Sequence, residues 1–241
     1  MVDFLDRIFR RTPGPSGKND SSDPTDPKKI PATPGSVGSA TESRASLQQS
    51  LAKVDAMIAK GRSMGLVHAP NNLQHWRDGS GTLLTMPTSA FENEAFIKNW
   101  LKTTVRQKFV DGTERRLRAG QAKPTDRIDM HYESARDLYA PFGTDLFFAL
   151  GGFTIRSEVV VQGEQNAGFT IFQFQSWTCM VKDDYNWDPG KTTWVPGFGV
   201  VTDDELRTLE KAGYGKEYPI VSKPWNVADP TVLQEFSISG F

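Results

Sequence analysis

Two consecutive stretches, 147–163 and 168–181, are rich in β-branched and aromatic residues and are separated by a Gly-Glu-Gln-Asn-Ala-Gly turn region. This composition predicts two long antiparallel strands joined by a hairpin. The apolar residues change parity at Ile171 and Phe172, so we expect a β-bulge there or burial of both strand faces. The hairpin constrains the fold most, because the other elements have to cover its apolar side chains.

Helical periodicity precedes the hairpin in two segments. In 43–62 apolar residues recur every three or four positions before Gly61, which predicts an amphipathic helix that stops there. A second helix is expected after a capping-box pattern formed by Ser89 and Glu92, with a broad apolar face that continues to Val105.

The other segments carry weaker sequence signals of secondary structure. Residues 111–140 are charged and weakly periodic, which favours a loop with short helical turns. After the hairpin, a capping box of Thr202 and Glu205 predicts a helix that ends at Gly213. Two further strands are expected to finish the sheet, at 218–221 and 236–238.

Together these patterns predict an α+β fold in which a helical region, 43–145, packs on a twisted antiparallel sheet or half-barrel, 146–241. An arm, 1–42, precedes both. Its first part, 1–11, has an amphipathic helical pattern, and 12–42 is dominated by Pro, Gly, Ser, Thr and Asp, as in a disordered linker. We expect the arm to dock on a partner or to serve as a tether.

Charge and composition exclude several classes of protein. The formal net charge is −1, from 28 Lys and Arg against 29 Asp and Glu, so no long-range attraction for nucleic acid is expected. The single cysteine, Cys179, excludes an internal disulfide, and the three histidines are too scattered for a zinc site. His68 and His75 are separated by Pro-Asn-Asn, which predicts a break rather than a shared helical face.

The sequence also lacks the signals of membrane insertion and of general secretion. No apolar run reaches the ~18 residues needed to span a bilayer, and the N-terminus lacks the apolar core of a signal peptide. We therefore expect a chain without a transmembrane segment that is made in the cytoplasm, and any export would need a dedicated machine.

Reactive groups concentrate in one stretch, KDDYNWDPGKTTW, at 182–194. Asp184, Asn186 and Asp188 alternate as in a calcium-binding loop, but Pro189 replaces the conserved glycine of that loop and Val195 replaces its last glutamate. A weaker Mg²⁺ or Ca²⁺ site remains open, with the metal ligands Asp183, Asp184 and Asp188. A purely structural interpretation also remains open, in which Tyr185 and Trp187 cover the open end of the sheet.

The context of this stretch resembles the catalytic domain of the colicin M family of bacteriocins. The resembling segments are ALGGFTIRS at 149–157, VKDDYNWDP at 181–189 and GYGKEYPI at 213–220, with HWRDGSGTLL at 75–84 as an upstream echo. The resemblance covers about the last hundred residues in fair order and spacing, through short motifs.

The resemblance implies a phosphodiesterase-type hydrolase that requires Mg²⁺. Members of the family cleave lipid II, the peptidoglycan precursor, between its undecaprenyl chain and its pyrophosphate. They use an Asp, a Tyr, a second Asp and a following His-Arg pair. By position, Asp183 and Tyr185 match the first Asp and the Tyr.

The other catalytic positions differ from the family pattern. Asn186 stands at the second Asp, and Thr192 and Thr193 stand at the His-Arg pair. An amide is no general base, and two hydroxyls do not replace an imidazole and a guanidinium. Three explanations are open: Lys191 supplies the positive charge while Asp184 or Asp188 acts as second carboxylate; His131 approaches from the other half of the fold; or the domain binds without cleaving.

From the sequence we therefore expect an antibacterial toxin that hydrolyses a lipid-linked cell-wall precursor. As an effector it would leave the producing cell through a secretion apparatus, of which type VI is our hypothesis, act in the periplasm of the target, and be neutralised by a cognate immunity protein. The N-terminal arm would load it. The alternative is a non-catalytic binding or accessory protein of a secretion system on the same scaffold.

Overall fold

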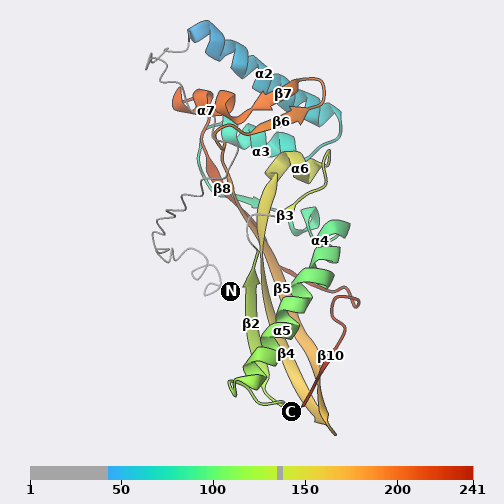
Figure 1. Cartoon of the computed structure of the whole chain (residues 1–241). Coiled ribbons are helices and arrows are strands. Elements are labelled where there is room, and N and C mark those ends of the chain that lie inside the picture. Colours follow the sequence, from blue (N-terminus) through green and yellow to red (C-terminus); the bar gives the residue numbers. More distant parts are fainter. Residues whose placement is uncertain (1–42, 135–137, 241) are drawn as a thin grey trace, which may run out of the picture. The chain divides into compact units, whose positions relative to one another are not determined.

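The computed structural model describes residues 43–134 and 138–240. The chain divides into two units, Met1–Thr41 and Glu42–Phe241, and the description below concerns the second. The expected helix at 1–11 and linker at 12–42 lie outside the described residues. The second unit has the α+β composition that the sequence predicts, with helices and a large sheet (Figure 1).

The predicted hairpin is present as two long antiparallel strands, β4 (Gly152–Asn166) and β5 (Phe169–Tyr185) (Figure 1). The bulge lies elsewhere than expected. Val160 pairs with Ser176 and Val161 with Phe174, so the register shifts at Gln175 rather than at 171–172. At this end of β5 the buried side chains are Thr170 and Phe172, whereas Phe169 is exposed and Ile171 is half-buried. The apolar residues here therefore do not mark the buried face of the strand.

Strands pair in the order β1 (Leu84–Met86), β8 (Tyr218–Ser222), β5, β4 and β2 (Arg127–Glu133). Two further strands pair with β5, namely β9 (Trp225–Asn226) and β10 (Phe236–Ser239), and β3 (Leu138–Tyr139) pairs with β4. The sheet is mixed, because β1 runs parallel to β8. Among the described residues of 146–241, the strand pairings are antiparallel, as the sequence predicts. A second, two-stranded sheet consists of β6 (Thr192–Val195) and β7 (Gly199–Thr202).

The first two helices are α2 (Arg44–Ser63) and α3 (His68–Arg77). The first continues past Gly61, and a positive φ of 79° occurs instead at Gly65. The second contradicts the predicted break at Pro-Asn-Asn. Pro70 is the third helical residue, where the N–H that proline lacks has no partner within the helix.

The N-terminus of α3 is held from a distant segment. The Asp145 carboxylate accepts hydrogen bonds from the backbone N–H groups of Val67, His68 and Ala69 at 2.9, 2.8 and 2.8 Å. Asp145 begins α6 (Asp145–Leu150), so this carboxylate joins the start of one helix to the start of another. Sequence reasoning missed α3 because its cap lies 77 residues away along the chain.

The expected second helix begins later and ends later than predicted. A 3₁₀ turn, η1 (Thr88–Ala90), precedes α4 (Ala95–Trp100), a π-helical turn η2 (Leu101–Val105) and α5 (Arg106–Arg118). The helix starts after Glu94, not at the predicted capping box of Ser89 and Glu92. Its last turns and β2 also occupy much of 111–140, where a loop was expected. The final helix, α7 (Asp203–Lys211), is capped as predicted: the Thr202 hydroxyl accepts the Glu205 N–H at 3.2 Å.

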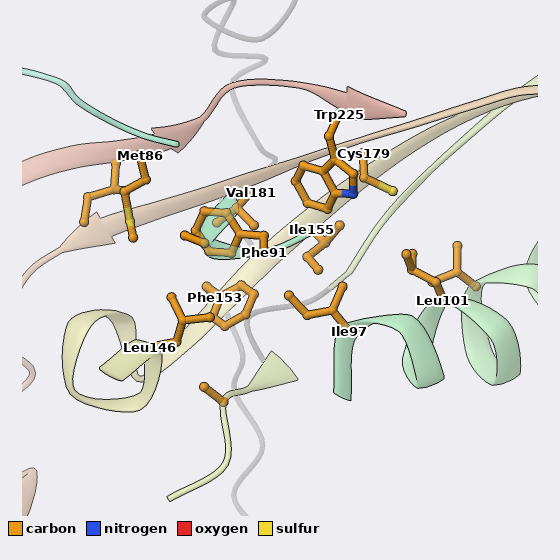
Figure 2. Packing of buried hydrophobic residues seen from close by; sticks show 14 of the residues in the cluster. Met86, Phe91, Ile97, Leu101, Leu146, Phe153, Ile155, Cys179, Val181 and Trp225 are labelled. Carbon is orange, nitrogen blue, oxygen red and sulfur yellow. The ribbon is translucent and has the colours of Figure 1, made fainter. Parts of the chain in front are cut away.

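The core lies between the helices and the hairpin. Figure 2 shows Phe91, Phe153, Ile155 and Trp225 gathered around the crossing of β4 and β5, with Ile97 of α4 beside them. Phe91 stacks on Trp225 with ring centroids 6.1 Å apart. Each of these side chains is at most 6% exposed, so the burial of apolar area that stabilises the fold is continuous from helix to sheet.

Gly163 of β4 offers a test of this packing. A methyl group added there would overlap the backbone oxygen of Pro124 and would lie 2.8 Å from Cε1 of Phe172. We expect Gly163→Ala to lower the free energy of unfolding by at least about 2 kcal/mol, measured by urea denaturation. Gly112→Ala in α5 is the matched control: its methyl meets only the flexible Met130 sulfur, at 3.4 Å, so stability should stay equal or rise by up to about 1 kcal/mol. Equal losses in both variants would contradict the assigned packing.

Candidate functional site

A cavity of about 520 Å³ lies where β5 ends. Its walls come from α2, α3, α6, the end of β5, the β6–β7 sheet and the start of α7. The stretch singled out in the sequence, 182–194, supplies much of one wall. The cavity thus collects segments that are up to about 150 residues apart in the chain.

The acidic end of the cavity, where Asp183 and Tyr185 lie, is formed by the last residues of β5. Asp183 and Tyr185 are two positions apart on a strand, so their side chains lie on one face. They are 7% and 8% exposed, and they pair in register with Ile220 and Tyr218 of β8. A carboxylate and a phenol are therefore held side by side on one face of β5, where this strand pairs with β8.

Aromatic rings pack against Tyr185 and against one another. Tyr185 stacks on Tyr218 with centroids 5.0 Å apart and meets the edge of Trp187 at 5.1 Å. Trp187 in turn meets Trp76 of α3 at 5.7 Å, and His75 packs edge-on against Tyr218 at 4.4 Å. We call these five rings, His75, Trp76, Tyr185, Trp187 and Tyr218, the aromatic column. Sequence reasoning missed the contribution of α3, because it expected a break in that helix.

Burial and charge keep the buried phenols neutral. The pKa of Tyr185 is raised well above its usual value by burial, and then by the negative charges of Asp183 and Asp203. The pKa of Tyr218 is likewise raised by burial, and further by Tyr185 and Asp183. The Tyr218 hydroxyl donates a hydrogen bond to the backbone oxygen of Asn72 at 2.8 Å. Tyr185 is therefore available as a neutral hydroxyl next to a carboxylate.

Asp203, the first residue of α7, is a further carboxylate in the cavity, and sequence reasoning did not single it out. It accepts the backbone N–H of Asp188 at 2.9 Å, and its own N–H donates to the oxygen of Lys191 at 3.0 Å. Burial raises its pKa, against the lowering effects of the Asp188 N–H and of Lys191. The capping box at Thr202 predicts that a helix starts here. Nothing in the sequence, however, indicates that the start of this helix contacts 182–194.

Lys191 is the cationic group beside these carboxylates. Its ammonium group forms an ion pair with Asp188, and that hydrogen bond is the main cause that raises the pKa of Lys191. The neighbouring Gly190 N–H donates to Asp204 at 3.2 Å. The loop between β5 and β6 is thus tied to the start of α7 at both Asp203 and Asp204.

The structure brings together almost all of the residues selected from the sequence. Eight of them line the cavity: Asp183, Asp184, Tyr185, Asn186, Asp188, Lys191, Thr192 and Thr193. His131 is not among the lining residues. It lies on β2 opposite Glu158, with an exposed side chain, so the explanation in which this histidine approaches the site finds no support in the geometry.

The predicted metal ligands do not form a site of three carboxylates. Asp183 and Asp184 are consecutive strand residues, so they point to opposite faces; the first is buried and the second exposed. Asp188 is engaged by Lys191. Within residues 43–134 and 138–240, no three His, Cys, Asp or Glu side chains are grouped so that they could hold a metal ion. The residues present therefore do not fit a metal site supplied by the protein alone, and the Mg²⁺ requirement stays a prediction.

Much of the remaining lining of the cavity is apolar. It includes side chains of four helices and of the β6–β7 sheet, among them Met57, Leu73, Phe147, Phe148, Val195 and Leu206. Asp183 and Asp203 together with these side chains give the cavity an amphipathic lining. Such a lining suits a ligand that carries an ionic group on an apolar chain.

Comparisons with known proteins identify no relative: no protein-family model, curated protein or solved structure matches the chain. Among the helices of the described residues, none has the length and apolar character needed to cross a bilayer.

The buried phenols allow a spectroscopic prediction. Of the five tyrosines, Tyr185 and Tyr218 should stay protonated when the pH passes the usual tyrosine pKa of about 10. Because their pKa values are higher in the folded protein than in the unfolded chain, their contribution to stability is complete below pH ~10 and is lost above it. In an absorbance titration at 295 nm, two tyrosines of the parent should ionise only when the protein unfolds at alkaline pH. In Tyr185→Phe, only one tyrosine should ionise in that unfolding step. Ionisation of all five before unfolding would contradict the buried arrangement.

Proposed function

We propose that this protein is an antibacterial effector that hydrolyses the lipid-linked diphosphate of a peptidoglycan precursor, as the resemblance to the colicin M family implies. One observation supports this most: Asp183 and Tyr185, which match the first Asp and the Tyr of the family, line a single cavity together with Asp203, Lys191 and many apolar side chains. The acidic end would act on the phosphate, and the apolar wall would accept the first units of the prenyl chain.

The proposed reaction uses two carboxylates with different surroundings. Asp183, buried beside Tyr185 on β5, would accept a proton from a water molecule as that water adds to the phosphorus nearest the chain. The bond from this phosphorus to the prenyl oxygen breaks, and the chain leaves as an alcohol. Asp203 suits the role of the acid that protonates the leaving oxygen, because burial raises its pKa.

Two further groups would stabilise the charge that grows on the phosphate. Lys191, held at the cavity by Asp188, supplies the positive charge that the missing His-Arg pair supplies in the family. The Tyr185 hydroxyl, kept neutral by burial, would donate a hydrogen bond. In this proposal Asp203 replaces the second Asp of the family, whose place is taken by Asn186.

The biological setting follows from the substrate. A lipid-linked precursor becomes accessible at the outer face of the target's inner membrane, so the effector would act in the periplasm after delivery by a secretion apparatus, with type VI as our hypothesis. A cognate immunity protein would protect producing cells, and residues 1–42 would load the effector.

A binding protein without catalysis is the second candidate. The amide of Asn186 and the hydroxyls of Thr192 and Thr193, all in the cavity wall, favour it, because they stand where the family has reactive groups. Such a protein would hold the same amphiphile or present it to a partner within a secretion system.

The test is a cleavage assay on purified lipid II with the full chain, in Mg²⁺ and in EDTA, with chromatography of the released head group. We expect release by the parent and a loss of at least about 100-fold in Asp183→Asn and in Asp203→Asn. Asp129→Asn, an exposed carboxylate on β2, is the matched control and should keep full activity.

Two results would contradict the proposal. If the parent binds lipid II without cleaving it, the binding protein is the correct alternative. If cleavage survives in Asp183→Asn and Asp203→Asn but is lost in His131→Ala, the reaction takes place elsewhere. The EDTA arm decides whether Mg²⁺ is needed.

A further inference from the structure

Large apolar side chains are exposed mainly around the candidate cavity. Among the described residues eight are exposed, and six of these either line the cavity or lie within three residues of a residue that does. We call these six the mouth patch: Met64, Val67, Tyr139, Phe142, Trp194 and Val200. Met64 and Tyr139 line the cavity themselves, and they are 47% and 59% exposed. Exposed apolar residues that adjoin a cavity in this way mark an interaction site more often than residues scattered over the surface.

The β6–β7 sheet contributes Trp194 and Val200 to the mouth patch, because side chains alternate between its two faces. Thr193 and its cross-strand partner Val201 line the cavity. Trp194 and its partner Val200 alternate with them and therefore point to the opposite face, where they are 53% and 61% exposed. One face of this small sheet thus closes the cavity, and the other presents a tryptophan and a valine to the surroundings.

Phe142 links the outer surface to the cavity wall. Its ring is 66% exposed, and its centroid lies 5.0 Å from Phe147 and 6.4 Å from Phe148, which both line the cavity. The apolar surface is thus continuous from the exposed ring to the interior. A prenyl or acyl chain in the cavity could leave along these rings without entering water.

Basic residues accompany the patch. Lys60 and Arg62 occupy the last turn of α2, two positions apart and directly before Met64. Both are exposed, and Lys60 lines the cavity. Near an anionic bilayer each such cation is worth about 1 kcal/mol of attraction. Tryptophan and tyrosine also prefer the interface between lipid and water.

We propose that the mouth patch docks the protein on a bilayer that contains anionic phospholipids, with the cavity opening toward the acyl chains. A bilayer fits better than a protein partner for two reasons. Met64 follows the basic residues Lys60 and Arg62, which match the charge of anionic lipid. Met64 and Tyr139 also line a cavity that suits an apolar chain. Docking does not depend on the proposed hydrolysis, because it uses none of the residues at the acidic end.

The test measures binding of the full chain to vesicles of phosphatidylcholine with about a third phosphatidylglycerol. Of the six tryptophans, all in the described residues, only Trp194 is exposed, so docking should shift the fluorescence to shorter wavelength, and Trp194→Phe should lose this shift. In co-sedimentation, Phe142→Ser with Trp194→Ser should weaken binding about tenfold or more. Phe169→Ser, which is 39% exposed on β5 and lines no part of the cavity, should bind like the parent.

The outcomes separate docking from catalysis. Asp183→Asn should bind vesicles as the parent does, even though it is expected to lose hydrolysis. Equal sedimentation of the double variant and the parent, with unchanged circular dichroism in both, would overturn the proposal. A parent that ignores vesicles but whose self-association depends on Phe142 and Trp194 would overturn it as well, and would assign the patch to protein contacts.

Discussion

The aromatic column is the contact on which the site depends. Its five rings join α3 to the ends of β5 and β8, three elements that are far apart in the sequence. Gly215 is part of this arrangement, because any side chain there would overlap the ring of Trp76, which is fully buried. Without the column, Tyr185 would lack the low-polarity surroundings that keep it neutral. Asp183 would then be an ordinary strand-end carboxylate in water.

The two carboxylates illustrate how the fold creates a site from ordinary elements. Asp183 is placed by the pleat of β5, whereas Asp203 is placed by the capped start of α7. The negative charges of both carboxylates raise the pKa of Tyr185, although the two residues lie on different elements. Lys191, on the loop between those elements, forms its ion pair with Asp188. The acidic end is therefore a product of tertiary packing rather than of a contiguous motif.

Sequence patterns predicted the parts of the structure whose causes are local. The hairpin, the helix at 44–63 and the cap at Thr202 follow from residue type and short spacing. The features that the sequence did not predict have distant causes: α3 is capped by Asp145, from 77 residues away, and the parallel pairing of β1 with β8 depends on a partner late in the chain. In the site, the stretch 182–194 was identifiable by its density of reactive groups, but Asp203 was not, because its position beside Asp188 exists only in the folded chain.

The central claim is that one cavity takes an amphiphile, with its phosphate at the acidic end and its chain along the apolar wall. A crystal structure of the full chain with geranylgeranyl diphosphate, grown with and without Mg²⁺, tests this most directly. The account predicts the phosphate nearest the chain within hydrogen-bond reach of Tyr185 and Lys191, with the prenyl units against Phe147 and Phe148. Diphosphate bound outside the cavity, or a chain that lies along another surface, would contradict it.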